Sequence, residues 1–83
     1  MLGLERGRVV ISLAGKDKGR LMAVVSFTDR EVLLTDGKLR PLERPKLKNI
    51  RHVALTEHIL ESGEMATNRR LRKALGLLKS EQR

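Results

Sequence analysis

The segment from residue 7 to residue 25 constrains the fold of this chain more than any other part of the sequence. It consists of a hydrophobic run, a short basic loop with a glycine at each end, and a second hydrophobic run. Two such runs separated by a glycine-containing turn are typical of paired β-strands. We expect a small barrel in which this loop presents backbone amides and basic side chains to a phosphate-bearing ligand.

Alternation with a period of two places these two strands. In the first, residues 8–14, one face consists of Val9, Ile11 and Leu13, and Arg8 and Ser12 lie on the opposite face, which is typical of a half-buried strand. The second strand covers residues 20–27 and is apolar on both faces. Its pattern predicts that Phe27, the only aromatic residue in the chain, is buried.

Three further strands are expected at residues 31–35, 38–42 and 50–55. Asp36-Gly37 is a strong short hairpin signal and should join the first two of these. Pro41 and Pro45 cannot donate to a strand ladder, so they place the fourth strand at an edge or in an irregular connection. Short strands with tight turns predict a mainly β fold, a barrel of SH3-like size with about five strands.

After the barrel, leucine and alanine residues recur at helical spacing between residues 67 and 80, with basic residues on the flanks. This pattern predicts an amphipathic C-terminal helix capped by Thr67. The face that we expect to pack on the barrel consists of Leu71, Leu75 and Leu78. A short helical turn over residues 56–63 should bury Ile59 and Leu60.

The length of 83 residues corresponds to one domain. We expect residues 1–56 to form the barrel and residues 57–83 to form a helical extension packed on or next to it. A core of this size supplies roughly 3–5 kcal/mol of net stability. Stability can therefore depend partly on a partner.

Charge indicates what that partner is. Eighteen Lys and Arg against ten Asp and Glu give a net charge of +8, as expected for a protein that binds nucleic acid. The chain has no cysteine, which excludes disulfides and thiolate chemistry. No apolar run approaches the roughly 20 residues that span a bilayer, and the N-terminus lacks the apolar region of a signal peptide. We expect a cytoplasmic protein without a membrane partner.

The basic loop, residues 15–19, is the first candidate site, together with Arg20 directly after it. Its two glycines permit positive φ and a close approach of ligand to backbone, and its cations can meet phosphates. The candidate RNA-binding residues here are Gly15, Lys16, Lys18, Gly19 and Arg20. The alternative is a solvated hairpin tip whose glycines serve only the turn. The spacing differs from that of a nucleotide-binding P-loop.

Residues 38–51, the proline-braced segment, carry six positive charges and one negative charge. Prolines stiffen this segment, so its charges could follow a phosphate backbone in register. The candidate contacts are Lys38, Arg40, Arg44, Lys46, Lys48 and Arg51. The alternative is a charged edge that prevents sheet aggregation.

The helix offers a third basic set, made up of Arg69, Arg70, Arg72 and Lys73. These residues could contact RNA or form a solvated face. A membrane-surface role has less support, because interfacial helices favour Trp and Phe at the apolar boundary and this helix has neither.

Catalysis has no comparable signal in this sequence. His52 and His58 have carboxylates nearby but no metal-ligand spacing, and no Ser/His/Asp set or close carboxylate pair is evident. We expect a protein that is not an enzyme and has no cofactor, metal or small-molecule substrate. With one aromatic residue it cannot stack a run of bases, which favours structured RNA held by shape and phosphates.

The two strands with their loop, residues 7–25, resemble the KOW motif of ribosomal proteins and NusG-type transcription factors. Residues 32–37 and 49–56 are similar to the continuation in large-subunit ribosomal KOW proteins of the fourteen-E type. The lead-in at 46–49 and the tail at 67–75 resemble short bacterial KOW RNA-binding proteins of that group. The chain departs from many KOW motifs at Leu21-Met22, where a further glycine is common.

The resemblance implies an SH3-like barrel that binds ribosomal or other structured RNA, with ribosomal proteins as further candidate partners. It carries the family's functional glycine to Gly19 and its basic loop positions to Lys16, Lys18 and Arg20. The alternative is a protein-interaction module of a transcription or translation complex, as in NusG-like KOW domains. That module would use the barrel edge or a free leucine face on the helix.

Overall fold

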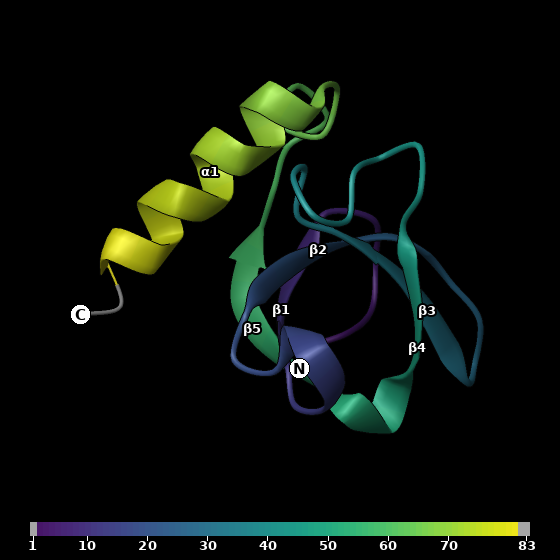
Figure 1. Ribbon diagram of the computed structural model, residues 1–83. Coiled ribbons are helices and arrows are strands. Elements are labelled where there is room, and N and C mark those ends of the chain that lie inside the picture. Colours follow the sequence, from purple (N-terminus) through teal and green to yellow (C-terminus); the bar gives the residue numbers. More distant parts are fainter. Residues whose placement is uncertain (1, 82–83) are drawn as a thin grey trace.

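The computed structural model describes residues 2–81 and contains one sheet, two short 3₁₀ turns and one long helix (Figure 1). The strands are β1 (Arg8–Ser12), β2 (Leu21–Phe27), β3 (Glu31–Thr35), β4 (Lys46–Asn49) and β5 (Val53–Ile59). The 3₁₀ turns are η1 (Gly15–Asp17) and η2 (Ile50–His52), and the helix is α1 (Asn68–Glu81). None of the helices in this part of the chain is long and apolar enough to cross a membrane.

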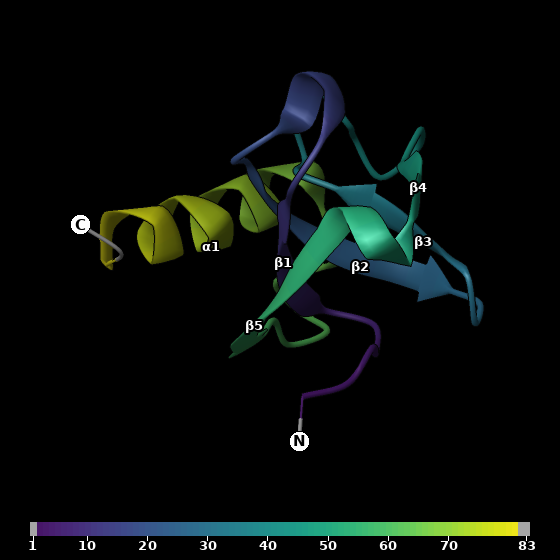
Figure 2. The ribbon, with the colours of Figure 1, turned by 90° about the horizontal axis from the view of Figure 1, so that it is seen from below.

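The five strands form one antiparallel sheet in the order β4-β3-β2-β1-β5. Register shifts in β1 and β2 mark irregularities of the kind that bend a sheet and increase its twist. The two edge strands, β4 and β5, are joined directly by η2, so the sheet curls toward closure (Figures 1 and 2). The fold is mainly β and barrel-like, as the sequence predicts.

Two apolar clusters lie on the two faces of this sheet. One cluster fills the inside of the curl and consists of Val10, Met22, Val24, Val32 and Leu34. The other joins β1 and β2 to the C-terminal part and consists of Val9, Leu21, Ala23, Leu60, Met65, Leu71, Ala74 and Leu75. The central strands are therefore covered on both sides, by the barrel interior and by α1.

The leucine face of α1 packs on the sheet, as the helical spacing predicts. Leu71 and Leu75 are buried and Leu78 is partly buried against the same cluster. The Oγ1 of Thr67 accepts a hydrogen bond from the backbone N of Arg70 at 3.1 Å, which confirms the predicted cap. In Figure 1 the helix lies on the side of the sheet away from β3 and β4.

The prediction that β1 is half-buried was wrong. Arg8 and Ser12, expected on a polar face, are buried. The guanidinium of Arg8 donates to the carbonyls of Gly3 at 2.8 Å and Thr56 at 3.1 Å, so its burial is compensated by hydrogen bonds. Leu13, expected on the apolar face, lies beyond the end of β1 and is exposed.

Phe27 is also exposed, contrary to expectation, with 46% of its surface accessible. The reason is the reach of β1, which pairs with β2 only over residues 21–23. The far end of β2 pairs with β3 alone, through Phe27 and Val32. No strand on the other side therefore covers the ring.

The expected fourth strand at residues 38–42 does not form. The carboxylate of Asp36 accepts hydrogen bonds from the backbone N of Lys38 and of Arg40, both at 2.8 Å. Thr35 donates from its hydroxyl to the carbonyl of Arg40 at 2.6 Å. These side chains occupy backbone groups that a hairpin ladder would need, so the chain makes a loop and β4 starts only after Pro45.

The closing strand is shifted along the chain relative to the prediction. Residues 50–52 form η2, because the side chain of Asn49 accepts from the backbone N of Arg51 at 2.9 Å and caps the turn. β5 then continues to Ile59, which pairs with Arg8 where a helical turn was expected. Ile59 is exposed, whereas Leu60 is buried as predicted. The expected division at residue 56 falls inside β5.

Candidate nucleic-acid interface

The basic loop has a defined backbone conformation. Gly15 and Gly19 have φ of +76° and +83°, which confirms that both positions use the left-handed region open to glycine. The backbone N of Gly19 donates to the carbonyl of Ser12 at 2.7 Å, and that of Lys18 donates to Gly15 at 3.2 Å. The side chains of Lys16 and Lys18 are carried outward on this loop and are exposed.

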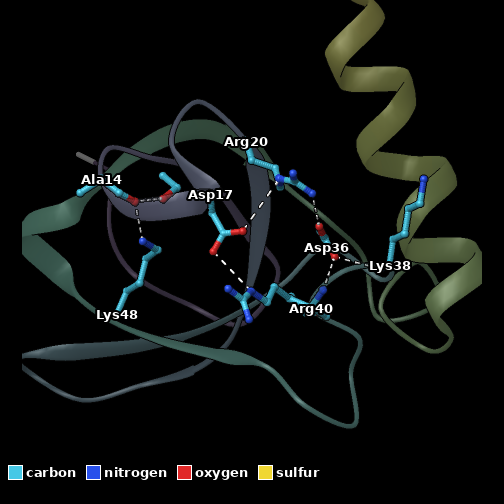
Figure 3. Close-up of polar contacts among 9 residues, drawn as sticks. Ala14, Asp17, Arg20, Asp36, Lys38, Arg40 and Lys48 are labelled. Carbon is cyan, nitrogen blue, oxygen red and sulfur yellow. Dashed lines mark hydrogen bonds and ion pairs between the residues drawn. The ribbon is translucent and has the colours of Figure 1, made fainter.

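Asp17 holds the basic loop against the rest of the molecule. Its side chain is buried, and its carboxylate lies 3.4 Å from Nε of Arg40 and 4.0 Å from Nε of Arg20 (Figure 3). On the other side of the loop, Nζ of Lys48 donates to the carbonyl of Ala14 at 2.7 Å. Lys48 and Arg40, from distant parts of the chain, therefore fix the loop at its start and at its centre.

Asp36 forms the second anionic centre of this network. Besides its two backbone donors, its carboxylate pairs with Nη1 of Arg20 at 3.2 Å. Burial alone would raise the pKa of Asp36, but the hydrogen bonds from Arg40, Lys38 and Arg20 outweigh it and hold that pKa below its ordinary value. Arg20 thus bridges two carboxylates, one from the basic loop and one from the loop after β3 (Figure 3).

Asp36 should make folding stability depend on pH in the acid range. A carboxyl whose pKa is lowered by folding adds stability above its unfolded pKa and loses it as the pH falls through the folded value. The free energy of unfolding should therefore decrease as the pH falls below about 5, and less steeply in Asp36→Asn. Urea unfolding followed by circular dichroism across this range measures both slopes. Identical slopes would mean that Asp36 does not contribute in this way.

Gly37 brings the loop after β3 against the start of α1. Its φ is +76°, and a Cβ there would lie only 2.6 Å from the backbone O of Asn68, so only glycine fits. The side chain of Asn68 accepts from the backbone N of Leu42 at 2.8 Å and donates to Glu43 at 2.7 Å. The helix is consequently fixed beside Lys38, the residue that follows Gly37.

A groove of about 760 Å³ lies where the basic loop, the loop after β3 and α1 meet. We call it the cationic groove. It is lined by Lys18, Gly19, Arg20, Leu21, Asp36, Lys38, Arg72, Leu75, Gly76 and Lys79. Five of these residues are cations, and the one carboxylate is the buried Asp36, already paired with Arg20.

Four of the groove cations are exposed and take no part in the ion pairs formed within residues 2–81. They are Lys18, Lys38, Arg72 and Lys79. In Figure 3 the side chain of Lys38 extends alongside α1. The fold thus gathers charges from three separate stretches of sequence onto one concave surface, where their potentials add.

The remaining candidate residues occupy other surfaces. Arg70 and Lys73 lie in a separate hollow of about 350 Å³ with Glu61 and Glu64, on a different face of α1. Arg51 lines a third hollow, at η2. Arg44 and Arg69 are exposed, and Lys46 is half-buried in β4. A Cβ at Gly15 would lie 3.4 Å from Nζ of Lys48.

Three of the candidate RNA-binding residues have an internal role. Arg20, Arg40 and Lys48 hold the basic loop in place through the contacts described above. Arg20 and Arg40 keep 38% and 30% of their side-chain surface exposed, so each guanidinium still reaches solvent. They position the loop and remain at the surface.

Several residues of this region were not among the candidates, and four of them are Asp36, Gly37, Asn68 and Lys79. The sequence assigns Asp36 to a hairpin turn. Nothing in the sequence indicates that its carboxylate accepts hydrogen bonds from the backbone N of Lys38 and of Arg40. Gly37 and Asn68 meet only in the folded chain. Lys79 could have been found, because it lies seven residues after Arg72 and two helical turns place both on one face.

A comparison of the chain with models of known protein families found no match.

Proposed function

We propose that this chain is a non-catalytic RNA-binding protein that acts on the ribosome or on another structured RNA. The observation that carries the proposal is the cationic groove, in which Lys18, Lys38 and Lys79 approach from three parts of the chain. The resemblance of the basic loop to the KOW motif supports the same function.

The groove suits a phosphate backbone for an electrostatic reason. Among the described residues that line it, the only carboxylate is that of Asp36, which is buried and bound to Arg20, so it cancels little of the surrounding positive charge. Each cation that neutralises a phosphate releases counterions, which makes binding favourable and sensitive to salt. Lysine and arginine on a rigid concave surface would recognise the shape of the backbone more than the identity of bases.

The first test is the salt dependence of binding to a folded fragment of ribosomal RNA, with duplex DNA of equal length as the comparison. We expect a steep decrease of log K with log salt and a clear preference for the folded RNA. Weak and equal binding to both nucleic acids would overturn the proposal, because it would reduce the charge to non-specific attraction.

A protein-interaction module is the second candidate, and one observation favours it. Phe27 and Leu47 are about half exposed and line a small hollow together with Leu33, at the β2–β4 side of the sheet. The leucine face of α1, which this function could also have used, is packed against the barrel. A partner would therefore bind at the sheet and leave the groove open.

A further inference from the structure

Gly76 is a glycine for which the fold provides no reason. It lies in the interior of α1, where glycine lowers helix stability relative to alanine. Its φ is not among the positive values found in the described chain, and a Cβ built on it would have no atom within 4 Å. An alanine could therefore replace it without strain or collision.

The position of Gly76 offers a reason outside the fold, because this residue lines the cationic groove between Arg72 and Lys79. Gly19 lies on the facing wall, and a Cβ there would also have open space around it. Each wall thus has a glycine in place of a side chain, Gly19 on one and Gly76 on the other. Lys18 and Lys38 line the same groove. The groove is open for a ligand to approach backbone closely between flanking cations.

We propose that the sugar–phosphate backbone of one RNA strand crosses α1 at Gly76, in contact with the helix, and that Arg72 and Lys79 hold phosphates on either side. This inference rests on the proposed RNA-binding function and specifies the path of the strand. Leu75 and Leu21 also line the groove but are buried in the core, so the surface left open to the strand is that of Gly76 and the flanking cations. A side chain at residue 76 would lift the strand away from both cations.

The test uses Gly76→Ala and Gly76→Leu, with Gly63→Ala as the matched control. Gly63 also has open space around it but lies in the hollow on the other face of α1. Gly76→Ala should raise the melting temperature by roughly 4–8 °C, because alanine favours the helix. Binding of the same folded ribosomal RNA fragment should weaken with side-chain size, by about tenfold for leucine, as when two phosphate contacts are lost.

Gly63→Ala should bind as the unchanged protein does. If Gly76→Leu is folded and binds RNA with unchanged affinity while charge reversal in the groove still weakens binding, the strand path is wrong and the RNA-binding function stands. If the unchanged protein shows no preference for folded RNA, the function and the path both fail. Stabilisation together with weaker binding is the combination that a purely structural glycine would not produce.

Discussion

Replacing Lys18 and Lys79 together with glutamate should weaken binding to the folded ribosomal RNA fragment by about a hundredfold at moderate salt. Two favourable phosphate contacts are lost and two repulsive charges are introduced on opposite walls of one groove. The slope of log K against log salt should also become shallower, since fewer counterions are released. Fluorescence anisotropy over a salt series gives both quantities.

The matched control reverses charge on the same helix but outside the groove. Lys73→Glu with Arg70→Glu changes the net charge by the same amount, at residues that line the separate hollow beside Glu61 and Glu64. Long-range attraction falls equally in both double variants, so a larger loss for Lys18→Glu with Lys79→Glu locates the contact. Equal losses would show that RNA senses only net charge, and the groove would then have no special role.

These two double variants differ in whether the changed charges line the cationic groove, which cannot be read from the sequence of α1 alone. Its basic residues predict a charged surface, but several of them are distributed around α1, and the sequence does not indicate which face meets the rest of the molecule in a groove. Arg72 and Lys79 face the basic loop only because Leu71 and Leu75 are buried on the adjacent side. Tertiary packing therefore decides which of the helix cations line the groove.

The strands at residues 8–12, 21–27 and 31–35 could be predicted from alternation and apolar content. Alternation did not predict the burial of Arg8 and Ser12 or the exposure of Phe27, which depend on the neighbouring strands and loops. The fourth strand could not be predicted. Asp36-Gly37 has the composition of a two-residue hairpin, yet the Asp36 carboxylate binds backbone donors further along and opens a loop. A side chain that competes for backbone hydrogen bonds is the reason for this difference.

The internal role of Arg20, Arg40 and Lys48 was likewise hidden from the sequence. From sequence alone, a basic residue near a basic loop is a candidate phosphate contact, whether or not a carboxylate of the protein pairs with it in the fold. Asp17 supplies one from within the loop itself, and its burial became evident only in the structure. Basic composition indicates that this region is charged. It does not indicate which cations hold the loop in place and which remain free of internal partners.

Leu71→Ala should destabilise the protein more than any groove substitution, because Leu71 is completely buried between α1 and the sheet. Truncating a buried leucine costs about 2–5 kcal/mol, through lost burial and the cavity left behind. A domain of this size has roughly 3–5 kcal/mol of net stability, so the loss approaches the whole. Thermal melting followed by circular dichroism should show a large decrease in melting temperature or no folded baseline at all.

Leu77→Ala is the control, since Leu77 is on the same helix and 60% exposed. It makes the same change of side chain and should leave the melting temperature nearly unchanged. RNA binding should weaken in Leu71→Ala and stay nearly unchanged in Leu77→Ala, because α1 supplies one wall of the cationic groove through Arg72 and Lys79. A Leu71→Ala protein that melts like the Leu77→Ala protein would contradict the docking of the helix, and with it the groove that depends on that docking.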